Sequence, residues 1–198
     1  HEHLAELRGL YGFRTFSGRG ASELKEWLFR EAEMAVSNED IARRFVAECR
    51  RTRTVLPATS TIERLCAAAL VDAERRIETR IASRLPMSIR EQLLALLEET
   101  ADDRVTRFVW LRQFEPGSNS SSANRLLDRL EYLQRVDLPE DLLAGVPAHR
   151  VTRLRRQGER YYADGMRDLP EDRRLAILAV CVSEWQAMLA DAVVETHD

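Results

Sequence analysis

The amino-acid sequence predicts an all-α protein of about eight to nine helices, built around one long central amphipathic helix. Apolar residues recur every three or four positions in most segments, which is the period of a helix with one buried face. Only eight glycines and six prolines occur, mostly between these segments, which leaves little room for a turn-rich β fold. An apolar fraction of 44% in 198 residues suits one large or two small packed domains.

The central helix is predicted over residues 60–85. Pro57 disfavours helix at Leu56, Ser60 with Glu63 forms a capping box, and Pro86 ends the segment. Arginines and glutamates occupy one face of this helix, which meets water or an anion. The opposite face needs an apolar partner, because it carries Ile62, Leu65, Ala69, Ala73, Ile77, Ile81 and Leu85.

Three shorter helices are predicted before the central one. The first ends at Gly12, Ser22 caps the second, and Ser37 with Asp40 at the third position opens the next. A very short turn between the last two is typical of an αα-hairpin, and also of a helix-turn-helix whose second helix enters a major groove. We expect the hairpin, because the turn lacks the frequent glycine.

After the central helix, Ser88 with Glu91 forms a second capping box, and Asp102 or Asp103 caps a helix carrying Phe108. Further helices are predicted through the leucines of residues 126–133, through residues 151–162, and from Glu171 to near the carboxy end.

The periodic pattern breaks at residues 115–123 (EPGSNSSSA), which form either a linker or a surface loop. As a linker, the segment separates a helical subdomain at 1–114, built on the central helix, from a second subdomain at 124–198. As a loop, it belongs to a single continuous domain.

Lys25 is the only lysine among 30 basic residues, and the arginines gather in two places. We call residues 43–53 the first basic cluster and residues 150–160 the second; each has five arginines against one glutamate. Such clusters in a chain of net charge −3 fit phosphate contacts, although an arginine face paired to acids of neighbouring helices gives the same pattern. The candidate DNA-binding residues are Arg43, Arg44, Arg50, Arg51, Arg53, Arg150, Arg153, Arg155, Arg156 and Arg160.

No catalytic or metal-binding pattern is recognisable. The three cysteines are far apart within apolar helical patterns, which predicts core residues in a reducing compartment, and no ligand spacing joins them to the four histidines. The sequence has no glycine-rich phosphate loop and no serine or cysteine paired with a histidine. We therefore expect no catalytic residues, no cofactor and no metal, and neither a membrane span nor a signal peptide.

Several short motifs follow one another along the chain: Tyr11-Gly12-Phe13, Leu56-Pro57, Ile62-Glu63-Arg64, Trp110-Leu111-Arg112, Leu138-Pro139 and Arg173-Arg174-Leu175-Ala176. Each motif is weak alone, but their order over nearly all 198 residues resembles the amino-terminal region of Tn-three family transposases. The chain begins at His1 without methionine, and we expect it to be a piece of a longer protein.

The resemblance implies a part in DNA recombination and in the replicative transposition of a mobile element. In this family the amino-terminal region recognises the terminal inverted repeats, and a carboxy-terminal RNase H-like domain holds an Asp-Asp-Glu metal site. The expected partners are inverted-repeat DNA and other domains of the same transposase, with a homodimer in the full-length protein. The expected place is the bacterial cytoplasm, on the nucleoid when DNA is bound.

Two other readings stay open. The chain can serve as a helical spacer or dimerisation module that makes no direct DNA contact, with its arginines paired to acids within the molecule. An independent small-molecule enzyme would need a deep pocket with convergent polar groups, and no sequence feature asks for one.

Overall fold

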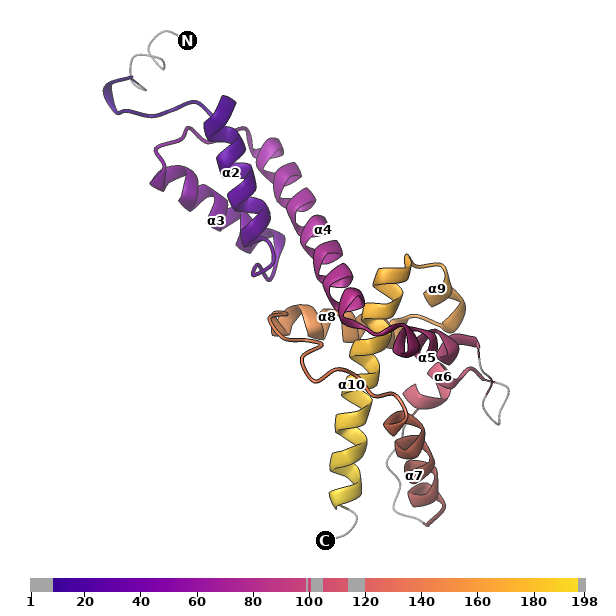
Figure 1. The fold of residues 1–198 in the computed structure, drawn as a ribbon. Coiled ribbons are helices and arrows are strands. Elements are labelled where there is room, and N and C mark those ends of the chain that lie inside the picture. The colour runs from indigo at the N-terminus through magenta and orange to yellow at the C-terminus, as the bar shows by residue number, and fades with distance from the viewer. Residues whose placement is uncertain (1–8, 99, 101–104, 114–119, 196–198) are drawn as a thin grey trace. The chain divides into compact units, whose positions relative to one another are not determined.

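The computed structural model describes residues 9–98, 100, 105–113 and 120–195, and these residues form nine helices without a β-strand (Figure 1). The prediction of an all-α fold is therefore confirmed. The helices are α2 (Gly18–Glu31), α3 (Asn38–Arg51), α4 (Thr59–Arg84), α5 (Met87–Glu98), α6 (Arg107–Arg112), α7 (Ser120–Gln134), α8 (Ala148–Arg160), α9 (Ala163–Arg167) and α10 (Glu171–Glu195).

The chain packs as two compact units, unit 1 (His1–Ile77) and unit 2 (Glu78–Asp198), which divide within α4. The sequence places its candidate boundary elsewhere, at 115–123. Residues 114–119 lie outside the described residues, and residues 120–123 are the first residues of α7. The division into subdomains at 1–114 and 124–198 stays a prediction.

In the described residues of unit 1, the core lies between α2, α3 and the first part of α4. Leu28, Ile41 and Phe45 are fully buried in this core, and the α4 face adds Cys66, Ala69 and Ala73. The α2 and α3 helices pack against each other across the short turn at 32–37, as predicted for an αα-hairpin. Phe16 closes the core from the preceding loop with an edge-on contact to Phe45 at 6.0 Å between ring centroids.

The two serine caps predicted in unit 1 differ in outcome. Ser37 is the N-cap of α3, and its hydroxyl accepts a hydrogen bond from the Asp40 amide at 3.1 Å. Ser22 is not a cap, because α2 begins at Gly18 with Ser17 as N-cap. The Ser22 hydroxyl lies inside the helix, where it donates to the Gly18 carbonyl at 3.4 Å.

The central helix α4 exists as predicted, and its apolar positions from Ala69 to Leu85 are buried. It begins at Thr59, so Ser60 lies within the first turn and does not cap it. Likewise α5 begins at Met87, because the Pro86 carbonyl accepts the amides of Ile89 and Arg90; the predicted box at Ser88 is wrong. Both helices start earlier than predicted, because a backbone carbonyl accepts their first amides. This carbonyl belongs to Ala58, just after Pro57, in α4 and to Pro86 itself in α5.

Unit 2 is organised around α10, which packs against α8, α7 and α5. Residues 175–182 of α10 (LAILAVCV) are all buried, as expected for a helix that is apolar on every side. Gly158 lets α8 approach this helix closely, since an added Cβ at this glycine would lie 2.2 Å from Cys181 Sγ.

Two other boundaries in unit 2 differ from the prediction. Thr106 caps α6, accepting the Val109 amide at 3.4 Å; the predicted caps Asp102 and Asp103 lie outside the described residues. The α8 helix ends at Arg160, so the helix predicted through residues 151–162 is shorter, and α9 follows separately.

Candidate nucleic-acid interface

The first basic cluster lies on and just after α3 in unit 1, and three of its arginines are paired to carboxylates. Arg43 lies 3.5 Å from Asp40, and Arg44 lies 3.1 Å from Glu31 and 3.3 Å from Asp40. Arg51 donates two hydrogen bonds to Glu48, at 2.6 and 2.7 Å, which lower the pKa of the Glu48 carboxyl.

The remaining two arginines of this cluster, Arg50 and Arg53, are exposed, and within the described part of unit 1 their side chains have no carboxylate partner. Arg53 adopts a left-handed backbone conformation with φ of 49°, which is uncommon for a residue other than glycine. This turn lets the Arg53 carbonyl accept the Arg14 amide at 2.8 Å, while the Arg14 carbonyl accepts the Val55 amide at 2.8 Å. The chain at 53–55 is thereby tied to the loop that precedes α2.

The second basic cluster lies on α8 in unit 2 and is more strongly engaged within the molecule. Arg150 is buried, with an exposed fraction of 3%, and both Arg150 and Arg153 have interactions within the chain. Arg155 lies 2.9 Å from Glu159 and 3.8 Å from Glu184. Arg156 and Arg160 are exposed and have no carboxylate partner in the part of unit 2 that the structure describes.

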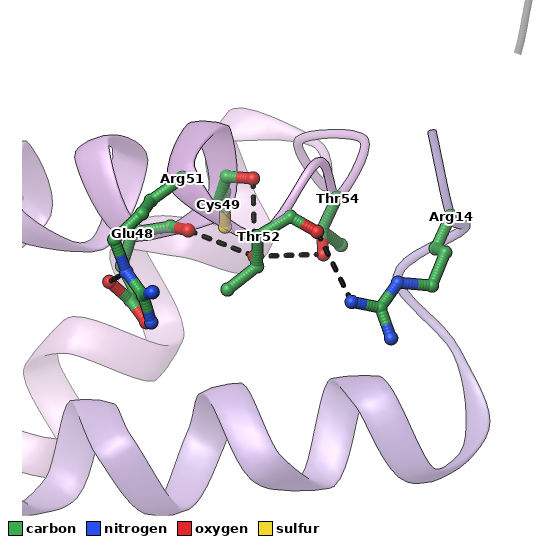
Figure 2. A network of polar contacts seen from close by, with 6 residues as sticks. All are labelled: Arg14, Glu48, Cys49, Arg51, Thr52 and Thr54. Carbon is green, nitrogen blue, oxygen red and sulfur yellow. Dashed lines mark hydrogen bonds and ion pairs between the residues drawn. The ribbon is translucent and has the colours of Figure 1, made fainter. Parts of the chain in front are cut away.

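Sequence reasoning missed a groove in unit 1, with a cavity volume of about 230 Å³, between α2 and the end of α3. We call it the α2 groove; its main lining residues are Arg14, Glu23, Trp27, Arg30, Glu48 and Thr52. Figure 2 shows one wall: Thr52 Oγ1 donates to the carbonyls of Glu48 (2.9 Å) and Cys49 (3.2 Å) and contacts Thr54 Oγ1 (3.0 Å). Arg14 reaches this wall by donating from Nη2 to the Thr52 carbonyl at 3.5 Å. These partners are 38 residues apart, so no local pattern reveals the groove.

Many other arginines satisfy carbonyls at helix ends. Arg112 of the Trp-Leu-Arg motif donates from Nη1 to the carbonyls of Gly158, Glu159 and Tyr161 at the end of α8, and Arg90 donates to Ala82 (2.7 Å) and Leu85 (3.1 Å) at the end of α4. Carbonyls at a helix end lack partners within the helix and carry partial negative charge, so a cation there is stabilising. The same arrangement is made by Arg167 at Leu97 and by Arg174 at Arg167.

A second cavity, of about 250 Å³, lies beside α6 and α7 in unit 2. Cζ of Arg107 lies 5.2 Å from the ring centroids of both Trp110 and Tyr132, and Asp128 and Glu131 also line this cavity. Arg135 is the second cation of the lining and lies 2.9 Å from Glu131, so two arginines face two carboxylates and the cavity has no excess positive charge for a phosphate.

The thiols of Cys49, Cys66 and Cys181 are unpaired and buried, as predicted for core residues. Burial raises the pKa of Cys49 to about 11 and that of Cys181 to about 12. Across the residues with described positions, no group of three His, Cys, Asp or Glu side chains is placed to hold a metal ion. Within the same residues, every helix is too short or too polar to cross a membrane.

Comparison with known proteins places this chain beside transposases. A family described only as a domain of unknown function (DUF4158) matches residues 1–69. The whole chain is 29% identical to the transposase for transposon Tn21 of Escherichia coli, 32% identical to that for Tn501 of Pseudomonas aeruginosa, and 27% identical to that for Tn1546 of Enterococcus faecium. Each alignment covers 100% of this chain and 20% of the relative, so the chain spans about one fifth of the length of these relatives.

The similarity runs through both units and is not confined to one motif. The family predicted from the order of the motifs is therefore confirmed, and the chain is homologous along its whole length to a segment of Tn-three family transposases.

Proposed function

We propose that this chain is a DNA-recognition segment of a transposase and binds the terminal inverted repeats during replicative transposition. The observation that carries the proposal is the set of exposed arginines without a carboxylate partner in the described residues: Arg50 and Arg53 in unit 1, and Arg156 and Arg160 in unit 2. An exposed arginine that is not paired with a carboxylate has its N–H donors available for phosphate oxygens.

The other members of the two clusters contribute less. Four of them share their donors with carboxylates: Arg43, Arg44, Arg51 and Arg155. Arg150 is left out of the proposed contact set because its side chain is buried, with an exposed fraction of 3%. Arg153 is exposed but has an interaction within the chain, so we assign it a smaller contribution to phosphate binding. Phosphate contacts of this kind give affinity and register, while base contacts give specificity.

We further propose that the segment carries out no catalysis and needs no cofactor, the chemistry residing in another domain of the transposase. Its partners are then inverted-repeat DNA and the other domains of the transposase, which acts as a homodimer on the nucleoid in the bacterial cytoplasm. The names of its relatives support a role in transposition.

A mobility-shift assay tests DNA binding. The probe is a duplex carrying the inverted repeat that flanks the gene for this chain, compared with a scrambled duplex of equal length over a salt series. Each phosphate contact contributes about −0.9 to the slope of log K against log salt, so R50Q/R53Q should flatten the slope by about 1.8. The matched control is K25Q/R64Q, which removes two exposed cations of unit 1 outside the cluster. Salt-insensitive binding, or equal binding of the scrambled duplex, contradicts the proposal.

The second candidate function is a helical spacer or dimerisation module without direct DNA contact. The contacts of Arg112, Arg90 and Arg167 with helix-end carbonyls favour it, because they account for part of the arginine bias by folding alone. Absence of any DNA shift, together with a concentration-dependent dimer in light scattering, would favour this function over DNA recognition.

A further inference from the structure

The α2 groove carries two positive charges that no carboxylate balances. Its two glutamates are already ion-paired to arginines of their own helices: Glu23 lies 2.9 Å from Arg19, and Glu48 receives two hydrogen bonds from Arg51. The other two cations of the groove are Arg14 and Arg30, both exposed and without a carboxylate partner among the described residues of unit 1. The groove is therefore electropositive although acidic side chains line it.

The two arginines stand at opposite ends of α2. Arg14 precedes the first turn, and Arg30 is in the last turn. The lining positions of α2 run from Gly20 to Arg30, which corresponds to about 15 Å along the helix axis. In one DNA strand the phosphates are about 3.4 Å apart along the duplex axis and farther apart along the strand itself, so a groove of about 15 Å that follows the strand spans at least two phosphates. A single small anion would contact only one of the two arginines.

Hydrogen bonds of Thr52 organise the wall of the groove that faces Arg14 (Figure 2). The hydroxyl of Thr52 donates its one proton to the carbonyls of Glu48 and Cys49 at the end of α3. The carbonyl of Thr52 accepts one N–H of Arg14. This single contact, at 3.5 Å, leaves most of the five donors of the guanidinium unused. Half-buried Trp27 packs against the core of unit 1 and gives the middle of the groove an apolar surface, suited to a deoxyribose between two phosphates.

We propose that the α2 groove binds a run of backbone phosphates of one DNA strand, with Arg14 and Arg30 as the contact residues and Trp27 between them. This proposal rests on the proposed function, and it assigns a contact surface outside both basic clusters. The partner is the sugar-phosphate backbone of DNA and not free phosphate.

Salt-dependent binding tests the two arginines. In the 198-residue chain, R14Q and R30Q should each weaken binding of the inverted-repeat duplex about three- to tenfold at physiological salt and flatten the salt slope by about 0.9. K25Q removes one positive charge of α2 outside the groove and should leave the slope near that of the wild type. R14K keeps the charge and should retain most of the slope, and thermal melting verifies that each variant folds.

Trp27 provides a local readout that does not depend on affinity. Binding of the duplex should change its fluorescence, and W27F should lose that component of the signal. Inorganic phosphate at matched ionic strength should cause no such change; a change with phosphate alone, and none with the duplex, overturns the proposal. If the wild type shifts the repeat but R14Q and R30Q bind like K25Q, the groove is not the contact and the proposed function stands. If the wild type binds no DNA, both proposals fail.

Discussion

Nη1 of Arg112 lies 2.6 Å from the carbonyl oxygen of Tyr161, and it also reaches the carbonyls of Glu159 at 3.3 Å and Gly158 at 3.4 Å. One guanidinium from α6 thus closes the carboxy-terminal end of α8, while its Cζ lies 5.6 Å from the ring centroid of Phe108 and 5.7 Å from that of Tyr162. The arginine of the Trp-Leu-Arg motif therefore has a folding role within unit 2.

Replacing Arg112 by Ala should destabilise unit 2 by about 2–3 kcal/mol, because it leaves several carbonyls without their charged donor and removes packing against two rings. Urea unfolding followed by circular dichroism gives this value. R156A is the matched control, since Arg156 is exposed on α8, and it should change stability by less than about 0.5 kcal/mol. Equal effects of the two substitutions would show that the carbonyl contacts do not stabilise the fold.

Replacing Gly158 by Ala should cost about 1–3 kcal/mol or more, because the new Cβ would lie 2.2 Å from Cys181 Sγ and 3.2 Å from Ile177 Cγ2. The double variant G158A/C181A should recover part of the loss, since it removes the sulfur that clashes. Gly20 in α2 is the control: it has open space around its Cβ position, and G20A should stabilise by about 0.5–1 kcal/mol. A neutral G158A would mean that α8 and α10 are not held at this separation.

Replacing Ser37 by Ala should cost about 1 kcal/mol, because the Asp40 amide at the start of α3 loses its acceptor. S22A should be close to neutral, since Ser22 lies inside α2 and donates only to the Gly18 carbonyl. Thermal melts of the two variants distinguish a cap from an interior serine. A larger loss for S22A would place the start of α2 at Ser22 instead.

The stability of unit 1 should fall in acid through Glu48. The hydrogen bonds from Arg51 hold the pKa of the folded-state carboxyl below its ordinary value of 4.5. The stabilisation is therefore present above about pH 4.5 and is lost as the pH falls toward the lowered pKa, because the unfolded state then binds more protons. Denaturant midpoints measured from about pH 6 to about pH 3 should fall less steeply for E48Q than for the wild type. Identical slopes for the two proteins would contradict this role of the ion pair.

Much of the fold could be predicted because helical periodicity is a local property. The apolar stripe of α4, the Ser37 cap and the apolar α10 segment at 175–182 all follow from residues within a few positions of one another. The predicted caps at Ser22 and Ser88 were wrong because capping signals are also local and do not single out one residue. Several nearby residues can cap a helix, and the backbone around Ser17 and Pro86 decides which carbonyl opens it.

The candidate site was only partly accessible from sequence. Clustering of arginine is visible in the chain, but pairing is decided across helices, as in the contact of Arg44 with Glu31 and the burial of Arg150. The α2 groove had no local signal at all, since Arg14 meets Thr52 across 38 residues. The two basic clusters also belong to different packing units, which no composition pattern shows.

The sequence by itself determined the all-helical class, the positions of most helices, the buried thiols and the kinship with Tn-three family transposases. These properties depend on hydrophobic period, on local capping chemistry and on the order of short motifs. Only the tertiary structure decided which arginines hold helix ends, which pair with acids and which remain available to phosphate. The guanidinium is the same in each case, and its role depends on the carbonyls and carboxylates that helix packing brings within hydrogen-bonding distance.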